Sequence, residues 1–423
     1  MTVKIKQKQE LTNYRMRCRF CASEVSRSLV DLGMSPLCEE YVPASKLNQM
    51  EKFYPLHALV CDQCFLVQVG DYVTPDDIYT EYAYFSSYSD SWIEHGRRYT
   101  ENICNTVQLG NESFVVELAS NDGYLLQHFA KKGIPVLGIE PAANVAVAAE
   151  EKGIPTVNKF FGVKTAKELL KEYPKPDLLI GNNVLAHVPD LNDFVAGMKI
   201  LLKPEGRITM EFPHLVKLMQ QNQYDTIYHE HFSYFSLTTV EKVFAFHGLQ
   251  LFDVDEIPTH GGSLRVHVRH EEDGSGEVSG AVTALRSFEN EFGISRIETY
   301  EEFGRHVEQS KRDLLTFLIN AKNDNKRIAG YGAPGKGNTL LNYCGIRRDF
   351  LDYTVDRNKY KHGCFTPGTR IPIYPTENIR QTKPDYLLVL PWNLLDEIVE
   401  QTSYIREWGG KWIVPIPNAA VIE

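Results

Sequence analysis

The sequence predicts an α/β protein with a cysteine-rich N-terminal head, a central Rossmann-like domain and a smaller C-terminal Rossmann-like domain. Two CxxC pairs within the first 64 residues predict the head. A strand, a glycine-containing turn, a helix and a second strand follow one another at 114–140, and a similar succession begins at residue 327. We expect the three parts to span residues 1–75, 76–255 and 256–423.

The composition is that of an ordinary globular protein. The 423 residues are 43% hydrophobic and 24% charged, with a formal net charge of -10. Such an acidic chain lacks the basic footprint of a nucleic-acid surface. No apolar run reaches the roughly 18 residues of a membrane span, and no secretory signal follows the basic N-terminus. We therefore expect no nucleic acid and no membrane as partners, and a cytoplasmic location, which the eight cysteines also favour.

The two CxxC pairs predict one metal site in the head. Each pair turns tightly enough to aim two thiolates at one point, and four thiolates make a closed, structural zinc site. The ligands would be Cys18, Cys21, Cys61 and Cys64, and Cys38, between the pairs, is the alternative ligand. A small zinc ribbon also fits a nucleic-acid module, but acidic residues interrupt the head and no basic stripe is present.

Tyrosines are dense just after the head. Tyr79, Tyr82, Tyr84 and Tyr88 fall within ten residues. Their rings and hydroxyl groups suit a sugar-sized pocket. The alternative is an amphipathic segment that only packs.

The start of the central domain has the pattern of a nucleoside-binding unit. A buried strand at 114–118 leads into a tight turn at 119–123, a helix at 124–132 and a second strand at 135–140. Glu140 ends this second strand, where a carboxylate suits a ribose diol.

The turn itself does not suit a dinucleotide. It contains one glycine, so the GxGxxG pattern and the close approach of a pyrophosphate are absent. Glu117 and Asp122 are also unsuited to phosphate, whereas they suit a cofactor with a ribose, a cationic sulfonium and an amino acid. The sequence therefore favours S-adenosylmethionine over a nicotinamide cofactor, with Asp122 at the ammonium or sulfonium side.

The next strand, from Asp177, carries polar residues at its carboxyl end. Asn182, Asn183 and His187 lie there, and ligands of open α/β sheets bind outside the carboxyl ends of strands. His187 would therefore face the crevice of Glu140, unless it only bonds to nearby backbone. The candidate cofactor-binding residues are Glu117, Ala119, Asn121, Asp122, Gly123, Glu140, Asn182 and Asn183.

The chemical centre is predicted at Tyr228-His229-Glu230-His231, after a strand at 207–213. Aromatic residues follow at once, as a partly desolvated pocket requires, and burial moves His and Glu pKa values into a useful range. The alternative is a solvated turn.

The C-terminal domain is predicted from a strand at 327–331, a glycine-rich turn and a helix. Gly337 stands where a P-loop has its magnesium-binding Ser/Thr, so an NTPase is disfavoured. Backbone N–H groups, a helix N-terminus and one lysine still suit a diphosphate. Residues 287–321 are expected to be helical and heavily charged, and they would connect the domains. The candidate substrate-binding residues are Tyr84, Gly335, Lys336, Asn338, Thr339 and Asp356.

The motifs, in their order along the chain, resemble those of the S-adenosylmethionine-dependent C-methyltransferases of nucleotide-linked deoxysugars. They are the CxxC pairs, VVELASNDGYLL, NNVLAHVPD, YHEHFSYFS, THGGSLRV and IAGYGAPGKGNTLLNYCGI. The resemblance runs from about Cys18 to the C-terminus. It implies that the head binds zinc, the central domain binds the methyl donor and the C-terminal domain holds a nucleotide diphosphate.

The resemblance also implies a substrate and a set of catalytic residues. The substrate would be a nucleotide-linked 4-keto-6-deoxyhexose, methylated at C3 or, in some members, at C5. Tyr79 and Tyr84 are the alternatives to Tyr82. The motif matches assign catalytic roles to Tyr82, His187, Tyr228, Glu230 and His231.

An enolate mechanism follows from the chemistry of carbon, which is a poor nucleophile. A ketone at C4 acidifies the hydrogen on C3, and His231 is the candidate general base. Glu230 would orient this histidine or tune its charge. Tyr228 and His187 would stabilise the enolate oxygen.

Two other functions stay open at this point. A sugar O-methyltransferase would use His231 to deprotonate a hydroxyl group, and a zinc-ribbon binding protein would have no activity. The sequence does not decide between dTDP and GDP or between C3 and C5, and we expect a monomer or weak dimer.

Overall fold

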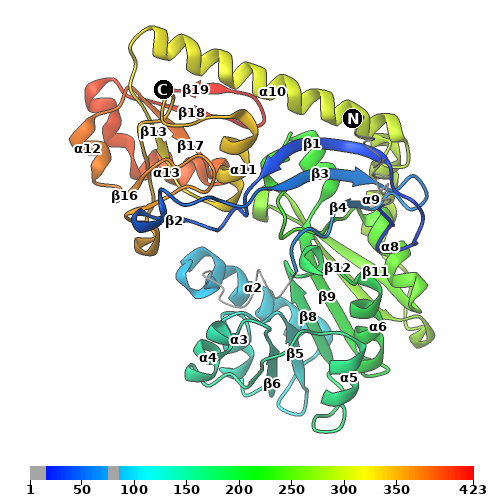
Figure 1. Cartoon of the computed structure of the whole chain (residues 1–423). Coiled ribbons are helices and arrows are strands. Elements are labelled where there is room, and N and C mark those ends of the chain that lie inside the picture. The colour runs from blue at the N-terminus through cyan, green and yellow to red at the C-terminus, as the bar shows by residue number, and fades with distance from the viewer. Residues whose placement is uncertain (1–15, 75–84) are drawn as a thin grey trace, which may run out of the picture.

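Seven strands form the central sheet of the computed structural model, which describes residues 16–74 and 85–423 (Figure 1). The strands are β5 (Val115–Leu118), β6 (Val136–Ile139), β7 (Thr156–Val157), β8 (Leu178–Asn182), β9 (Arg207–Pro213), β11 (Leu249–Ile257) and β12 (Ser263–His270). Their order is β11-β12-β9-β8-β5-β6-β7, and all neighbours from β9 to β7 are parallel. The order reverses between β5 and β8, where such sheets open a ligand crevice.

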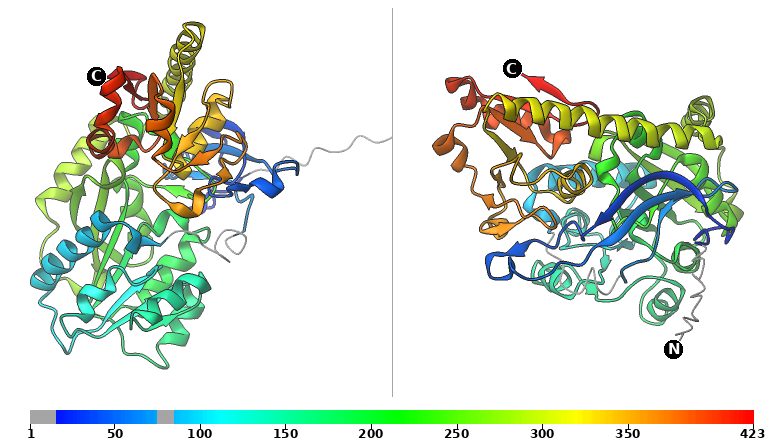
Figure 2. Two further views of the ribbon diagram at one scale, coloured as in Figure 1. Left: turned by 90° about the vertical axis from the view of Figure 1, so that its left-hand side faces the viewer. Right: turned by 45° about the horizontal axis from the view of Figure 1, so that its top comes forward.

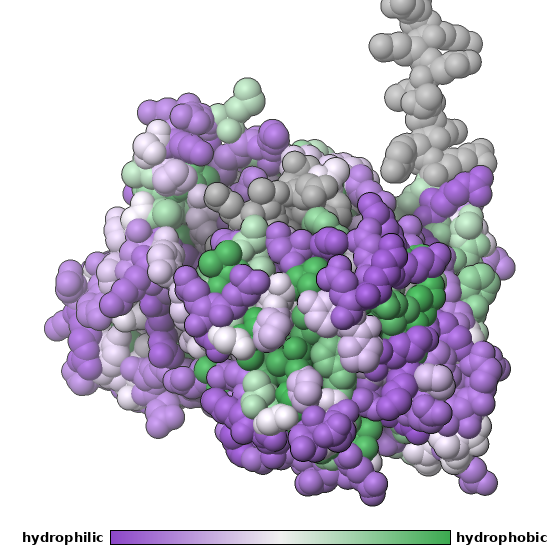
Figure 3. Space-filling view, turned by 90° about the horizontal axis from the view of Figure 1, so that it is seen from below, coloured by the Kyte–Doolittle hydropathy of each residue, from purple (hydrophilic) through white to green (hydrophobic). Residues whose placement is uncertain are grey.

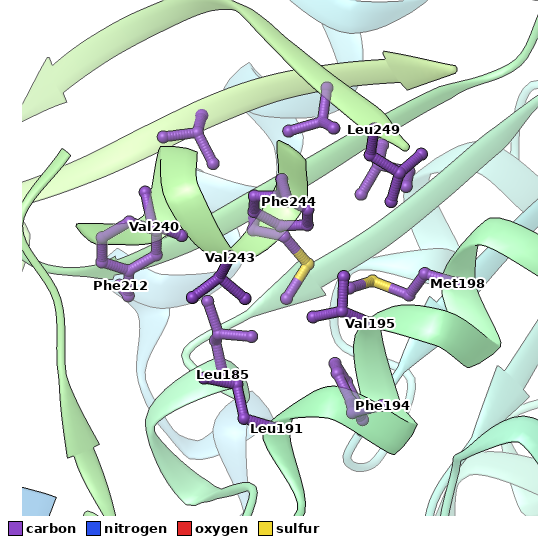
Figure 4. Packing of buried hydrophobic residues seen from close by; sticks show 14 of the residues in the cluster. Leu185, Leu191, Phe194, Val195, Met198, Phe212, Val240, Val243, Phe244 and Leu249 are labelled. Carbon is purple, nitrogen blue, oxygen red and sulfur yellow. The ribbon is translucent and has the colours of Figure 1, made fainter. Parts of the chain in front are cut away.

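Helices cover this sheet with apolar faces at helical spacing. Between β8 and β11, α6 and α8 contribute Leu191, Val240 and Phe244 to one buried hydrophobic cluster, which also contains Phe212 of β9 (Figure 4). This packing fixes the carboxyl end of β9, from which the predicted chemical centre departs. The helices of the central region are α2 (Asp90–Val107), α3 (Leu126–Ala130), α4 (Ala143–Glu151), α5 (Val163–Leu169), α6 (Leu191–Leu201), α7 (Leu215–Gln220), α8 (Leu237–Phe246) and α9 (Gly280–Phe292).

The head forms a four-stranded sheet that includes a strand from the central domain. Its order is β1 (Arg27–Ser35), β3 (Tyr54–Val60), β4 (Val67–Val69) and β10 (Ser233–Tyr234). Strand β10 begins two residues after His231 and pairs antiparallel with β4. The head therefore holds one end of the predicted catalytic loop. A second pairing, of β2 (Val42–Pro43) with β15 (Cys364–Phe365), joins the head to the C-terminal domain.

The C-terminal sheet repeats part of the strand order of the central sheet. Its first strand again lies between its second and fourth, in the order β16-β14-β13-β17-β18-β19. The elements are β13 (Ile328–Tyr331), α11 (Gly335–Cys344), β14 (Thr354–Val355), β16 (Ile373–Tyr374), α12 (Asn378–Thr382), β17 (Tyr386–Val389), α13 (Leu395–Gln401), β18 (Lys411–Val414) and β19 (Ala420–Ile422).

The region 287–321, which was predicted to be helical, is helical apart from one interruption. Two helices occupy this region, α9 and the 27-residue α10 (Ile297–Asn323), which runs along β1 (Figure 2). Gly293 ends α9 in the left-handed conformation, with φ 92°. A glycine there carries no Cβ penalty, so α9 ends at this position and α10 begins a few residues later.

The predicted fold class, with a cysteine-rich head and two Rossmann-like domains, is confirmed. Strand β12 lies beyond the boundary expected at residue 255 but belongs to the central sheet. Polar residues surround a hydrophobic area on the face seen from below (Figure 3). Among the described residues, no helix is long and apolar enough to cross a membrane.

Candidate active site

The four cysteines of the CxxC pairs converge in the head. Their sulfur atoms all lie within 4.8 Å of one another, and Cys18, Cys61 and Cys64 are buried. Sγ atoms of Cys18 and Cys64 are 3.5 Å apart, as are those of Cys21 and Cys61. Four thiols at these separations fit one tetrahedral zinc ion with no open position.

The backbone has the same left-handed conformation directly after each cysteine pair. Ala22 and Phe65, each directly after a pair, have φ of 59° and 65°. Their N–H groups donate to the carbonyls of Cys18 and Cys61. The predicted alternative ligand, Cys38, lies outside the cluster and contacts Glu230, in the predicted chemical centre, instead.

The cofactor crevice begins at the turn after β5, whose backbone is left-handed at three places. Ala119, Asn121 and Gly123 have φ of 53°, 49° and 75°. The turn lies close against β6, because a Cβ added to Gly138 would be 2.4 Å from Oγ of Ser120. A side chain at 138 would push the turn away from the sheet.

Glu140 sits just past β6 and holds this turn. Its carboxylate accepts from the N–H of Asn121 at 3.0 Å and from that of Ala142 at 2.8 Å. Burial raises the pKa of Glu140 to about 7, although both N–H groups oppose the rise. Its place at the tip of the second strand is the one predicted for a ribose contact.

Several buried polar atoms at the ends of β5 and β8 have no hydrogen-bond partner among the described residues. They are Glu117 Oε2, Ser120 Oγ, both amide atoms of Asn182, and Asn183 Oδ1. Buried polar groups are normally paired, so such a group of unsatisfied atoms indicates a missing polar ligand. Burial raises the pKa of Glu117 well above its usual range, and the charges of Glu140 and Asp122 add to this effect. A ligand with a cationic centre and a ribose fits this set.

Asp122 already has a cationic partner. Its carboxylate contacts Lys152 Nζ at 2.7 Å and accepts from the N–H of Ser87 at 3.3 Å. The N–H of Ser86 donates to Asn121 Oδ1 at 2.8 Å. These contacts tie the segment before α2 to the cofactor turn, so Asp122 shapes the crevice wall.

The structure brings three of the predicted catalytic rings together. The rings of Tyr228 and His231 are 4.0 Å apart between centroids, and those of His187 and His231 are 4.7 Å apart. Nδ1 of His231 is 3.1 Å from the carbonyl oxygen of Thr226, which fixes the proton on Nδ1 and leaves Nε2 as an acceptor. This carbonyl, rather than Glu230, orients the ring.

Both histidines are neutral near pH 7. Burial lowers the pKa of His187 to about 4, although a hydrogen bond to the backbone of Glu230 opposes the shift. Burial also lowers the pKa of His231 well below its usual value, and His187 adds to this effect. A small cavity borders His231, with a wall of Ala186, Phe212, Pro213, Thr226, Ser233, Tyr234 and Phe235.

Glu230 is buried and carries its proton near neutrality. Burial, and next the charge of Glu39, raise the pKa of Glu230 to about 8. A neutral carboxyl group donates a hydrogen bond, unlike a carboxylate. The fourth member of the motif, His229, instead contacts the carbonyl of Pro55 in the head.

The C-terminal domain brings a positive charge close enough to act on His231, at Lys336. Among the described residues Lys336 forms no ion pair; its Nζ donates to Asn393 Oδ1 at 2.9 Å and lies 4.9 Å from the ring of Trp392. Burial lowers its pKa. The indole of Trp392 donates to Asp225 at 2.7 Å, and burial raises the pKa of this aspartate to about 7.

The other predicted substrate residues of the C-terminal domain take structural contacts. Asn338 is buried and donates to the carbonyl of Cys38 at 2.7 Å. Thr339 is buried, with no partner for its hydroxyl among the described residues. Asp356 accepts from the N–H of Ala333 at 2.7 Å, as Glu140 does from the cofactor turn. Gly335 lies beside Cys38.

Sequence reasoning missed an ion-pair network at the end of β9. The fully buried Glu211 contacts His95 at 3.0 Å, Arg265 at 2.7 Å and the hydroxyl of Thr259 at 3.1 Å. Trp92 stacks on His95 at 4.9 Å. A glutamate inside the apolar strand ITMEFP was the available signal, because such a group needs buried partners.

Three tyrosines singled out in the sequence lie outside the described residues. They are Tyr79, Tyr82 and Tyr84. Their predicted places in the pocket therefore stay predictions. The described segment that follows them, from Phe85 to the start of α2, borders the cofactor turn.

Comparison with known proteins agrees with this arrangement. Three family descriptions match in turn: "Putative zinc binding domain" over residues 18–79, "Methyltransferase domain" over 94–254 and "C-methyltransferase C-terminal domain" over 258–417. The fold, the Cys₄ site and the crevice thus define a zinc-containing, S-adenosylmethionine-dependent methyltransferase.

The similarity to one curated relative covers almost the whole chain. The C-methyltransferase NovU of Streptomyces niveus is 35% identical over 405 residues, which are 96% of each chain. The chain belongs to this family of C-methyltransferases. A ubiquinone biosynthesis O-methyltransferase of Bartonella tribocorum is 28% identical over 93 residues, 22% of this chain and 38% of that one. The structure of PH0226 from Pyrococcus horikoshii superposes with a TM-score of 0.37 at 15% identity, covering 47% of this chain and 97% of that one.

Proposed function

We propose that this C-methyltransferase methylates C3 of a nucleotide-linked 4-keto-6-deoxyhexose, with dTDP or GDP as the nucleotide. The observation that carries the proposal is the buried cluster in which the rings of Tyr228 and His187 lie 4.0 and 4.7 Å from the ring of His231, with the buried Glu230 next to His231 in the chain. A base beside several neutral hydrogen-bond donors suits the formation of an enolate next to a ketone.

His231 removes the proton from C3. Because Thr226 holds the proton of Nδ1, the lone pair of Nε2 is available to accept another. A buried, neutral imidazole stays in the basic form at all pH values above its lowered pKa. Burial disfavours a charged His231, so the base releases the proton readily after the reaction.

Tyr228 and Glu230 stabilise the negative charge that develops on the C4 oxygen. Burial raises the pKa of Tyr228 well above its usual range, so it keeps its proton and donates. Glu230, with a pKa of about 8, is also protonated near pH 7. Donors fixed in a water-poor pocket are worth more than the same donors in water.

S-adenosylmethionine, when bound, supplies an electrophilic methyl group to the enolate carbon. Glu140 would contact the ribose, and Glu117 with Asn182 would hold the polar methionine end, since their atoms lack partners. Asn183 Oδ1 lies at the same edge of the sheet. Tyr82, proposed as catalytic, and Tyr84, proposed as substrate-binding, lie outside the described residues.

Each of the three parts of the chain has a separate role in this proposal. The head carries zinc, the central domain binds the methyl donor, and the C-terminal domain holds the nucleotide diphosphate through Lys336 and the N-terminus of α11. Asn338 and Asp356 support that turn through their bonds to Cys38 and Ala333, and Thr339 lies in the first turns of α11.

Mass spectrometry tests the proposal. The zinc-loaded protein is incubated with S-adenosylmethionine and a dTDP- or GDP-linked 4-keto-6-deoxyhexose, in H₂O and in D₂O. We expect a gain of one methyl group, and deuterium beside the ketone in the remaining substrate. Product NMR then assigns the methyl to C3, C5 or an oxygen; attachment to oxygen, or no methyl gain with either nucleotide, would overturn the proposal.

A further inference from the structure

A short segment of the head, Cys38–Tyr41, reaches into the active site between β1 and β2. It is anchored to the glycine-rich turn of the C-terminal domain at both of its ends. The side-chain amide of Asn338 donates to the carbonyl oxygen of Cys38 at 2.7 Å. The hydroxyl group of Tyr41 donates to the carbonyl oxygen of Ala333 at 2.5 Å. Lys361 reinforces the second anchor, with Nζ 2.8 Å from the Tyr41 hydroxyl.

The first residue of this segment touches the catalytic loop. The thiol of Cys38 donates to Oε1 of Glu230 at 3.8 Å, within the range of a hydrogen bond from sulfur. Both side chains are buried, at 4% and 6% exposure, so the contact is shielded from water. Cys38 is outside the zinc cluster, and its thiol is therefore free to make this contact.

Glu39 is turned toward the same place. A Cβ added to Gly335 would be 3.0 Å from the Cys38 sulfur and 2.9 Å from Oε1 of Glu39, so both side chains converge on the start of α11. The other carboxylate oxygen of Glu39 is 3.9 Å from Lys361 Nζ. The absence of a side chain at Gly335 makes room for this convergence.

The two head residues act on Glu230 in opposite directions. The negative charge of Glu39 raises the pKa of Glu230, after the larger effect of burial, and the Cys38 thiol lowers it. Burial keeps the thiol itself protonated, because it raises the pKa of Cys38 well above its usual value. The other groups facing Glu230 are Tyr228, on its own loop, and His187, which bonds to its backbone.

We propose that Cys38 and Glu39 are positioning residues that together control the proton carried by Glu230, and that the head thereby takes part in the reaction. The inference rests on the proposed function, since it needs Glu230 to donate a hydrogen bond in the enolate step. Glu39 favours the protonated form by charge, and Cys38 holds the carboxyl group in place through its thiol. The contribution of the head is thus more than the zinc site.

The pH dependence of kcat/KM tests this proposal. Activity requires protonated Glu230, so the wild-type enzyme should lose activity as the pH rises through about 8. Glu39→Gln removes a like charge and should move this alkaline limb to lower pH. Cys38→Ala removes the donor and should move it to higher pH, and Cys38→Ser should restore it. We expect each displacement to be about half a pH unit or more, from the usual worth of one hydrogen bond.

Controls separate this inference from a structural role and from the proposed function. Glu40→Gln removes the charge of the exposed residue next to Glu39 and should leave the alkaline limb of the kcat/KM profile unchanged. Glu230→Gln should remove the limb. Variants that lose thermal stability but keep the wild-type limb, or that move it in the same direction, would overturn the inference. A wild-type enzyme that transfers no methyl to a ketosugar would instead contradict the proposed function.

Discussion

His229 and His231 lie two residues apart in one loop, but their rings have different surroundings. His231 packs against Tyr228 and His187, whereas His229 contacts Pro55 and the ring of Tyr54 in the head. Of the two, only His231 packs its ring against other predicted catalytic rings. Substitutions of these two residues can therefore be compared to identify the general base.

His231→Ala should reduce the rate of methyl transfer by about a thousandfold, because a general base contributes about 10²- to 10⁴-fold. The dissociation constant for S-adenosylmethionine, measured by calorimetry, should change little, since the cofactor turn is built by other elements. His229→Gln should keep most of the turnover. Equal losses in both variants would mean that the loop, and not the base, was damaged.

The protonation of Glu140 should set the pH dependence of cofactor binding. Its pKa is raised to about 7, so below that pH it is neutral and above it the carboxylate accepts bonds from a ribose more strongly. The dissociation constant for S-adenosylmethionine should therefore fall as the pH rises from 6 to 8. Glu140→Gln should bind more weakly and lose this trend between pH 6 and 8; an unchanged trend would exclude Glu140 as its source.

At the scale of elements, one carboxylate of α9 holds the start of α8. The fully buried Glu289 accepts from the N–H groups of Leu237 and Thr238, at 2.6 and 2.8 Å, and contacts His214 at 2.7 Å. The N-terminus of a helix has unsatisfied N–H groups and favours a negative charge. Helix α8 in turn packs over β9, which carries the catalytic loop.

Glu289→Ala should lower the free energy of unfolding by about 3 kcal/mol, since it leaves several buried donors and a histidine without their partner. Urea unfolding followed by circular dichroism gives this value. Glu291→Ala, two residues on and exposed, is the control and should change it by less than about 0.5 kcal/mol. Comparable losses in the two variants would contradict a specific role for Glu289.

Short sequence motifs predicted the features whose residues lie in one short stretch of the chain. The turn after β5, the acidic tip at Glu140 and the cysteine pairs were recognised because each lies within a few residues of its partners. The pairing of β10 with β4 and the contact of Cys38 with Glu230 were not, since they join residues more than 150 positions apart. The network around Glu211 also depends on three separate elements. Such contacts follow from packing, which residue spacing does not encode.

At the scale of the whole molecule, the head is packed between the other two parts (Figure 1). One hydrophobic cluster joins Leu29 and Leu56 of the head with Leu314 of α10 and Leu340 of α11. Another joins Cys61 and Leu66 with the central sheet. The head therefore shares its core with both domains instead of folding around the metal alone.

Zinc should consequently support the reaction as well as stability. Strand β4 pairs with β10, and Arg19, inside the first cysteine pair, donates to the carbonyl of Phe232 at the end of the catalytic loop. Loss of the metal frees both cysteine pairs and hence this side of the loop. Cys61→Ser, or treatment with a chelator, should lower the unfolding temperature by several degrees, because the free energy of binding a structural zinc ion is part of the free energy of folding.

The same treatment should reduce methyl transfer more than cofactor binding, because the crevice at β5 and β8 has its own supports in Glu140 and Lys152. Turnover, zinc content and binding of S-adenosylmethionine are measured together below the unfolding temperature. Cys104→Ser, a buried thiol outside the cluster, is the control for loss of a cysteine and should keep zinc and turnover. A metal-free protein with the wild-type rate would show that the catalytic loop keeps its shape without the head, and a parallel loss of cofactor binding would show that zinc acts on the whole fold.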